Sequence, residues 1–166
     1  MKKIIFALCW LCMIAPSQAN DLKSWKGSTT PPLVLKDLSG KTHKLEDYRG
    51  KVVMLQFWAT YCAPCIKEMP SMMRLKAKLA DKPFIILAVN MGETDKEVRD
   101  FLDTKVKVDF TVLMDGEGQS LAAWKVFVAP STFLIDPQGT VRYTVQGAVE
   151  WDEQQYVKAI SDLLPK

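Results

Sequence analysis

The chain alternates between short, nearly unbroken apolar runs and stretches in which apolar residues recur at helical spacing. Two runs, residues 52–58 and 84–89, lack the polar alternation of a half-exposed strand, so both are predicted to be strands buried on two faces. Between them, apolar residues recur every three or four positions over residues 66–79, which predicts an amphipathic helix. Pro64 fits the first turn of this helix, whereas Pro70 lies inside it and is expected to kink it. Strand, helix and strand in this order predict a parallel pair with a right-handed crossover.

Turn residues divide the rest of the chain into shorter elements. The turn-like segments 37–40 and 136–139 each separate two short apolar stretches, which predicts hairpins over residues 33–45 and 132–145. The sequence Thr94-Asp95-Lys96-Glu97 is a capping-box pattern that marks the start of a helix. The remaining predictions are the end of that helix near residue 104, a strand over 111–114, a brief helix over 119–124 and a closing helix over 152–164.

The N-terminal segment has the layout of a secretory signal. Two lysines precede an uncharged run over residues 4–15, which is shorter than the roughly 20 residues that a membrane-spanning helix needs. Ser17-Gln18-Ala19 places small residues two positions apart, the pattern that a signal peptidase cleaves. We therefore expect residues 1–19 to be a signal peptide cleaved after Ala19 and the protein to be periplasmic. An uncleaved membrane anchor is the alternative.

The length and charge of the remaining chain suit one compact domain. We expect a lead-in over residues 20–30 and a single domain over residues 31–166, with nothing that demands more than a monomer. Removal of the predicted signal takes away two lysines and no acid, so the formal net charge falls from +3 to +1. Acidic and basic residues are interspersed, without the clustered basic face of a nucleic-acid-binding protein. Nucleic acid is therefore excluded as a partner.

The positions of the cysteines indicate which reaction the protein could carry out. Cys9 and Cys12 lie in the predicted signal, so Cys62 and Cys65 would be the thiols of the exported protein. A disulfide between residues three apart closes too small a loop to stabilise the fold much, so its presence indicates a chemical role. Cys62 lies where a predicted strand meets a predicted helix, and a helix N-terminus favours the reactive thiolate. Cys65, one turn further on, can form a reversible disulfide with it by thiol exchange.

Two other uses of a Cys-x-x-Cys motif fit the sequence poorly. Structural zinc needs four Cys or His ligands, whereas the mature chain would offer two cysteines and His43. Covalent haem attachment requires a histidine after the second cysteine, and this position is Ile66. We expect no metal and no cofactor, and we expect His43 to face solvent on the first hairpin.

Three segments carry a family resemblance: residues 52–70 around the cysteines, residues 37–51 before them and residues 128–136 after them. Together they are similar to the TlpA, ResA and CcmG type of bacterial thioredoxin-like proteins, over essentially residues 31–164. The resemblance implies an α/β, thioredoxin-like fold with a central mixed sheet and helices on both faces. It also implies an N-terminal hairpin and a central insertion over residues 91–110.

The resemblance implies roles for individual residues. Cys62 matches the exposed attacking cysteine and Cys65 the resolving cysteine, which together form the redox-active disulfide. Glu68 matches an acid that tunes the thiols, although a solvated position on the helix is the alternative. Pro130 matches a cis-proline that packs beside the disulfide, in keeping with the preference of cis bonds for proline.

Residues beside the cysteines and the proline are expected to dock the substrate: Trp58, Tyr61, Ala129 and Pro130. Packing in the core is the alternative for Trp58. The sequence departs from the family at two positions, since Tyr61 replaces the usual tryptophan and Gln56 replaces a frequent asparagine.

The resemblance implies an extracytoplasmic thiol-disulfide oxidoreductase that reduces disulfides in exported proteins or apocytochrome c. The implied electron donor is a membrane thiol reductant of the DsbD or CcdA type. Motif spacing alone does not set the direction of electron flow, because such couples range from about −270 mV in thioredoxin to about −120 mV in the oxidant DsbA. The alternatives are a thiol peroxidase and a redox-inert thioredoxin-like binding domain. A peroxidatic site usually surrounds a single cysteine, whereas Cys62 has a partner within its own motif.

Overall fold

A computed structural model describes residues 22–166, and the predicted signal peptide lies outside this part of the chain. An eight-stranded mixed sheet forms its centre, with the strand order β1-β8-β7-β4-β5-β6-β2-β3. The strands are β1 (Lys23–Ser24), β2 (Val34–Asp37), β3 (Thr42–Lys44), β4 (Val52–Trp58), β5 (Phe84–Met91), β6 (Thr111–Asp115), β7 (Ser131–Ile135) and β8 (Val141–Gln146). The helices are the 3-10 helix η1 (Leu45–Tyr48), α1 (Ala63–Lys78), α2 (Asp95–Thr104), α3 (Gln119–Ala123) and α4 (Gln154–Leu163).

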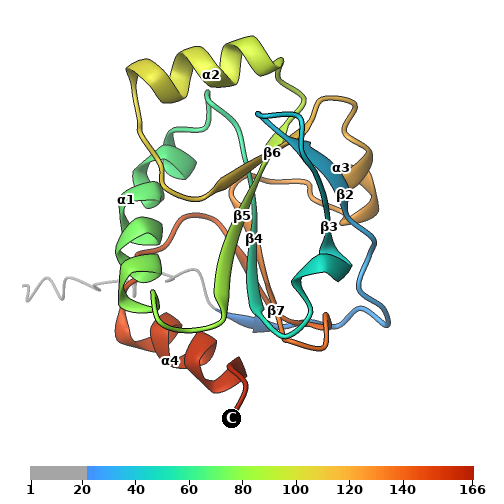
Figure 1. Cartoon of the computed structure of the whole chain (residues 1–166), viewed down its shortest axis with the longest axis vertical. Coiled ribbons are helices and arrows are strands. Elements are labelled where there is room, and N and C mark those ends of the chain that lie inside the picture. The colour runs from blue at the N-terminus through green and yellow to red at the C-terminus, as the bar shows by residue number, and fades with distance from the viewer. Residues whose placement is uncertain (1–21) are drawn as a thin grey trace, which may run out of the picture.

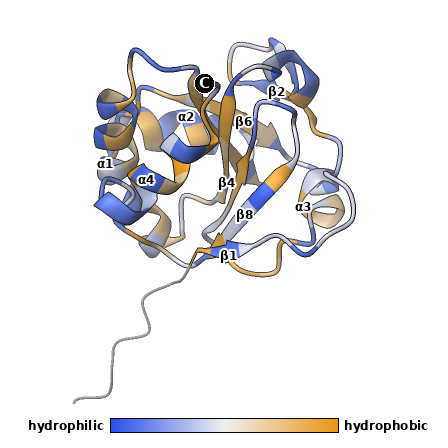
Figure 2. Cartoon of the chain, turned by 90° about the horizontal axis from the view of Figure 1, so that it is seen from below, coloured by the Kyte–Doolittle hydropathy of each residue, from blue (hydrophilic) through white to orange (hydrophobic). Residues whose placement is uncertain are grey.

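Helices lie on both faces of this sheet (Figures 1 and 2). Buried residues of α1, α2 and α4 form one apolar cluster with one face of the sheet. The residues around α3 and η1 form a second cluster on the opposite face. The ribbon of β4 is orange along most of its length (Figure 2), as expected for a strand covered on both faces. The predicted α/β, thioredoxin-like architecture is therefore confirmed. Among residues 22–166, no helix is long and apolar enough to cross a membrane.

Strand β4 is the middle of the core and is buried at every position. It pairs in parallel with β5 and antiparallel with β7, so the predicted parallel pair is confirmed. Successive side chains of a strand point to opposite faces. Met54 and Trp58 therefore join the cluster on the α1 face, and Leu55 and Phe57 join the other cluster. Gln56 shares the register of Met54 and Trp58, which places its amide on the α1 face.

Most predicted elements are present, with small shifts at their ends. Both hairpins form antiparallel pairs, and the capping box at Thr94 opens α2 as predicted. Helix α1 starts at Ala63, with Pro64 in its first turn as predicted and Pro70 inside it. The kink expected at Pro70 stays a prediction. Two elements were not predicted: η1, and strand β1, whose two residues pair with β8 inside the segment expected to be a lead-in.

The prediction that His43 faces solvent was wrong. Strand β3 alternates exposed, buried and exposed residues, and His43 is its buried middle residue, with 6 % of its surface exposed. Its Nε2 lies 2.8 Å from a carboxylate oxygen of Asp37, and its Nδ1 is hydrogen-bonded to the hydroxyl of Tyr48. Hydrogen bonds from Ser39 and His43 hold the pKa of Asp37 well below its usual range. The histidine thus braces the first hairpin against η1.

We predict that His43→Ala lowers the free energy of unfolding by about 2 kcal/mol, because the change empties a buried site and leaves the Tyr48 hydroxyl without its partner. Urea unfolding at neutral pH measures this loss. Thr42→Ala, at the exposed neighbouring position of the same strand, is the matched control and should cost about 0.5 kcal/mol or less. Equal losses in the two variants would contradict a bracing role for His43.

Candidate active site

The two cysteines lie where β4 leads into α1. Four residues separate the end of the strand from the helix, and Cys62 is the N-cap residue of α1. Its sulfur forms a disulfide with Cys65, with an S–S distance of 2.03 Å and a Cα–Cα distance of 5.3 Å. Cys62 Sγ also accepts a hydrogen bond of 3.3 Å from the backbone N–H of Cys65. After reduction, this N–H and the dipole of α1 would favour a thiolate at Cys62.

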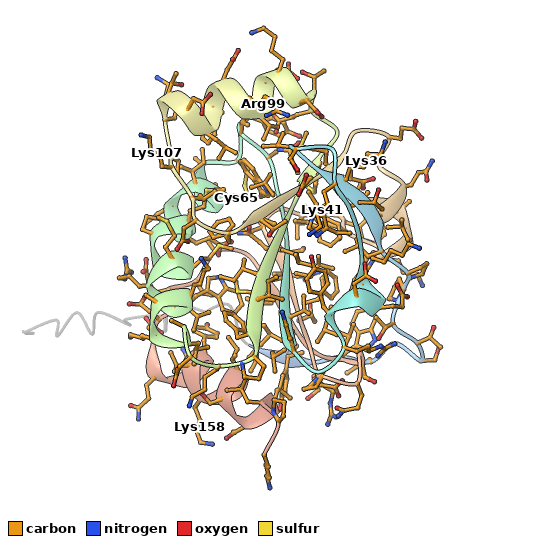
Figure 3. All side chains as sticks on the ribbon, in the orientation of Figure 1. Lys36, Lys41, Cys65, Arg99, Lys107 and Lys158 are labelled. Atoms are coloured by element: carbon orange, nitrogen blue, oxygen red, sulfur yellow. A yellow bond between two sulfur atoms is a disulfide. The ribbon has the colours of Figure 1, made fainter. Side chains whose placement is uncertain are left out.

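The two cysteines are both largely buried but differ in their exposure to solvent. Cys62 keeps 9 % of its surface exposed, whereas Cys65 is completely buried. Figure 3 shows the side chain of Cys65 in the interior of the protein, while Lys158 extends outward from α4. Only a sulfur that can be reached can be attacked by an outside thiol. The geometry is consistent with Cys62 as the attacking cysteine and Cys65 as the resolving one.

A carboxylate holds the loop that precedes Cys62. Glu93, just after β5, accepts a hydrogen bond of 2.7 Å from the backbone N–H of Thr60 and another from its hydroxyl. The Asn90 amide donates a further hydrogen bond of 2.7 Å to the same carboxylate. Residues 59–61, which lead into the disulfide, are therefore tied to the end of the neighbouring strand. Sequence reasoning did not single out Glu93, because its partner Thr60 lies 33 positions away, nor Asn90, whose contact with the site runs through Glu93.

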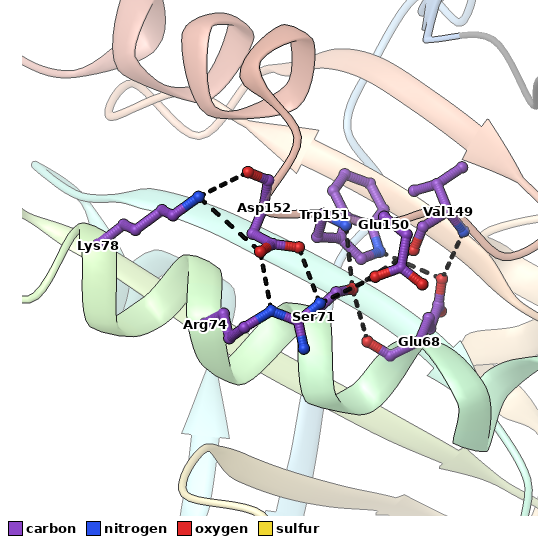
Figure 4. Close-up of polar contacts among 8 residues, drawn as sticks. All are labelled: Glu68, Ser71, Arg74, Lys78, Val149, Glu150, Trp151 and Asp152. Carbon is purple, nitrogen blue, oxygen red and sulfur yellow. Dashed lines mark hydrogen bonds and ion pairs between the residues drawn. The ribbon is translucent and has the colours of Figure 1, made fainter.

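Glu68 lies one turn after Cys65 on the face of α1 that packs on the sheet. It is 1 % exposed, so the alternative of a solvated helical acid was wrong. The Nε2 of Gln56 in β4 donates to Oε1 of the carboxylate. Its Oε2 accepts two hydrogen bonds of 3.2 Å, from the backbone N–H of Val149 and from the indole N–H of Trp151 (Figure 4). Three parts of the chain thus converge on one carboxyl group.

Burial raises the pKa of the Glu68 carboxyl from its ordinary value of 4.5 to about 7. Loss of water around the charged form is the dominant cause, and the negative charge of Glu150 acts in the same direction. The hydrogen bonds from Gln56, Val149 and Trp151 oppose this effect, because they stabilise the carboxylate. The result is a buried group that can bind or release a proton near neutral pH, as a general acid or base requires.

A shallow groove runs beside the disulfide. The peptide bond between Ala129 and Pro130 is cis, as the family resemblance implied. The Pro130 carbonyl accepts a hydrogen bond of 2.8 Å from the N–H of Gly147, which joins the proline loop to the end of β8. The groove has a volume of about 570 Å³ and is lined by Ala63, Pro64, Lys67, Ala129, Pro130, Gly147 and Ala148. The first turn of α1 and the proline loop therefore share one surface.

The residues expected to dock a substrate fall into two groups. Tyr61 is 77 % exposed beside Cys62, and Ala129 and Pro130 line the groove. Trp58 is fully buried in the core, so its assignment to the docking surface was wrong and the core alternative is correct. The reason is that β4 is a central strand with both faces covered, so residue 58 packs into the cluster on the α1 face. Sequence reasoning also missed Phe127, which is 85 % exposed just before the proline loop, in a stretch without helical or strand periodicity.

Comparison with known proteins agrees with this geometry. Residues 27–144 match the AhpC/TSA family. The chain is 42 % identical over 135 residues to the thiol-disulfide oxidoreductase ResA of Geobacillus thermodenitrificans, covering 81 % of this chain and 77 % of that protein. The chain belongs to the AhpC/TSA family, as a thioredoxin-like thiol-disulfide oxidoreductase of the ResA type.

Solved structures of similar oxidoreductases have the same fold. A protein from Chlorobium tepidum assigned as the thiol:disulfide interchange protein DsbE is 33 % identical, with a TM-score of 0.77 over 87 % of this chain and all of that one. The exposed lipoprotein thioredoxin Etrx1 of Streptococcus pneumoniae is 27 % identical, with a TM-score of 0.68 over 77 % of this chain and 98 % of that one. The oxidoreductase therefore carries its Cys62–Cys65 pair on a scaffold that related proteins share.

We predict that the buried Glu68 makes the stability of this oxidoreductase depend on pH. In the unfolded chain Glu68 titrates near 4.5, and in the folded protein near 7. Stability from the extra bound proton is therefore fully present below pH 4.5 and is lost as the pH rises through 7, by about 3 kcal/mol in total. Urea unfolding of the oxidised protein at pH 4.5 and pH 8 measures this loss of stability.

Glu68→Gln is the matched control, because glutamine has a similar shape and does not titrate. The difference in unfolding free energy between the wild type and this variant should change by about 3 kcal/mol between the two pH values, in favour of the wild type at low pH. The same difference at both pH values would show that the Glu68 carboxyl titrates alike in the folded and unfolded chains.

Proposed function

We propose that the protein reduces disulfides in exported proteins or in apocytochrome c, through the Cys62–Cys65 dithiol with Glu68 as its proton partner. The observation that carries this proposal is the arrangement of one accessible sulfur, one buried sulfur and one buried acid on successive turns of α1. In such a site, Cys62 can form a mixed disulfide with a client protein, and Cys65 can then displace the client by forming the Cys62–Cys65 disulfide.

The exchange would proceed in two steps. The Cys62 thiolate attacks one sulfur of the client disulfide, so that a Cys62–client bond forms and the other client sulfur leaves as a thiolate and takes up a proton. Cys65 then attacks Cys62 Sγ, forms the Cys62–Cys65 disulfide and releases the second client sulfur, which is also protonated. The client gains two electrons and two protons, and the protein dithiol loses them.

Glu68 supports the second of these steps. Cys65 is buried and must lose its proton before it attacks, because the thiolate is the nucleophile. Side chains three residues apart on a helix lie on the same face. With its pKa near 7, the Glu68 carboxylate is suited to accept that proton at neutral pH.

The proposed setting of the reaction is supported by the predicted signal and by one relative. The predicted signal over residues 1–19 and the exposed location stated for the Streptococcus pneumoniae relative support a place outside the cytoplasm. There, a membrane dithiol reductant of the DsbD or CcdA type would return the Cys62–Cys65 disulfide to the dithiol and become oxidised itself. The groove beside Pro130 and the exposed Tyr61 would receive the client segment that carries the disulfide.

We predict that Cys65→Ser traps the client. The serine hydroxyl cannot displace the client from Cys62, so a mixed disulfide accumulates in the native envelope and can be identified by mass spectrometry under non-reducing conditions. Cys62→Ser removes the attacking sulfur and is the matched control. Absence of any trapped exported protein in Cys65→Ser, or an equal yield with Cys62→Ser, would contradict the proposal.

The direction of electron flow has its own test. As a reductant, the Cys62–Cys65 couple should equilibrate with glutathione or dithiothreitol buffers at a potential near the thioredoxin value of about −270 mV. A value near the −120 mV of the oxidant DsbA would overturn the reductant assignment. Rapid consumption of hydrogen peroxide by the dithiol form, with release of two waters per disulfide formed, would instead favour the thiol peroxidase alternative.

A further inference from the structure

The segment after β8 is fastened to α1 beside Glu68. Ser71 Oγ accepts a hydrogen bond of 3.0 Å from the backbone N–H of Trp151 and donates one of 2.7 Å to the carbonyl of Glu68. One turn further on, Arg74 Nε donates to Asp152 at 2.8 Å, and its Nη2 contacts both Asp152 and Glu150 (Figure 4). The contacts of Ser71 and Arg74 with residues 150–152 join parts of the chain about 80 positions apart, and they hold this segment against the middle of α1.

Trp151 occupies the centre of this fastening. Its side chain is completely buried and packs on the ring of Tyr156, with 5.1 Å between the ring centroids. Its indole N–H donates to Glu68 Oε2 at 3.2 Å. Among the tryptophans of residues 22–166, Trp124 donates to a backbone carbonyl, and Trp25 and Trp58 have no hydrogen-bond partner for their indole nitrogen. In this part of the chain, Trp151 is thus the tryptophan whose indole contacts an acidic side chain.

We propose that Trp151 is a positioning residue for Glu68: its indole N–H holds the carboxylate in place and controls how readily Glu68 takes up a proton. The functional meaning of this inference rests on the proposed role of Glu68 in disulfide exchange. The contact between Trp151 and Glu68 does not depend on that role, because it is present in the oxidised protein.

The indole contact is one of three hydrogen bonds that favour the ionised form of Glu68, and the charged groups nearby are few. The charge of Glu150 raises the pKa of Glu68, and Arg74 partly offsets that charge by binding Glu150. Lys67 lies on the rim of a cavity of about 200 Å³ that is lined by Lys67, Glu68, Ala148, Val149 and Glu150. From β4, the facing group is the neutral Gln56, and the Cys62–Cys65 disulfide on α1 is also uncharged. The cavity offers a route by which the proton of Glu68 can reach solvent.

Removal of the indole donor has a defined consequence. The ionised form of Glu68 would lose one of its three donors, while the protonated form would lose little, since a hydrogen bond to a charged group is the stronger one. Trp151→Phe should therefore raise the proton affinity of Glu68 roughly tenfold, which is about one pH unit. Phenylalanine keeps an aromatic ring against Tyr156, so the packing change is small beside the loss of the N–H.

The test follows the side-chain carboxyl carbon of Glu68 by ¹³C NMR as the pH of the oxidised, full-length protein is raised. Trp124→Phe is the matched control, because it removes a buried indole donor on the opposite face of the sheet. We expect the Glu68 titration to move up by about one unit in Trp151→Phe and to stay within about 0.2 unit of the wild type in Trp124→Phe. A purely structural role for Trp151 would lower the melting temperature of Trp151→Phe and leave the Glu68 titration in place.

An unchanged titration in Trp151→Phe, or an equal shift in both variants, would overturn the inference. If Trp151→Phe does not fold, Ser71→Ala takes its place, because it removes the acceptor of the Trp151 backbone N–H without changing any charge. Ser71→Ala should shift the titration in the same direction by a smaller amount, and no shift would again overturn the inference. The pH profile of insulin reduction by Glu68→Gln separately tests the proposed function: a profile identical to the wild type would remove Glu68 from the exchange, whatever the NMR titration shows.

Discussion

The buried carboxyl group of Glu68 is the constraint on which the active site depends. A carboxylate without water is costly unless hydrogen bonds replace its hydration. Here the replacements come from Gln56 on the central strand and from Val149 and Trp151 after the last strand, so helix α1, the sheet and the C-terminal segment must all be in place at once. The same convergence sets the proton affinity of the one acid that lies a turn away from Cys65.

The sheet explains why these groups meet. Alternation along β4 sends Gln56 to the α1 face, and the parallel crossover from β4 to β5 lays α1 over that face. The start of α1 then falls at Cys62, where the helix N-terminus favours a thiolate, and the cis-proline loop before β7 brings Pro130 to the same end of the helix. The order of the strands in the sheet thus brings the groups of the redox centre together.

Local patterns in the sequence predicted much of the fold and the position of the disulfide. Apolar runs located β4 and β5, turn residues located both hairpins, and the Cys-x-x-Cys spacing located the disulfide, since each depends on residues that are close in the chain. The burial of Glu68 could not be derived from its helical spacing, which fits a solvated face equally well. One of its three hydrogen-bond donors, Trp151, lies 83 positions away in the chain. No local pattern encodes such a pairing.

The errors have the same origin. His43 is buried because the register of β2 on β3 and the position of η1 bring Asp37 and Tyr48 to its two ring nitrogens, and neither is visible in a three-residue strand. Trp58 was placed at the surface because of its nearness to Cys62 in the chain, although β4 lies in the middle of the sheet and is buried at every position. The two-residue strand β1 is too short to show alternation, and it is recognisable only through its partner β8.

The most direct test of the account is the reduction potential of the Cys62–Cys65 couple, measured from pH 5 to pH 9 in the wild type and in Glu68→Gln. If Glu68 exchanges its proton in step with the disulfide, its proton affinity must differ between the oxidised and reduced protein, and by linkage the gap between the two potentials must change with pH. We predict that this gap changes around pH 7, the region in which the Glu68 carboxyl titrates. A gap that stays constant across the whole range would contradict the coupling of Glu68 to the redox centre.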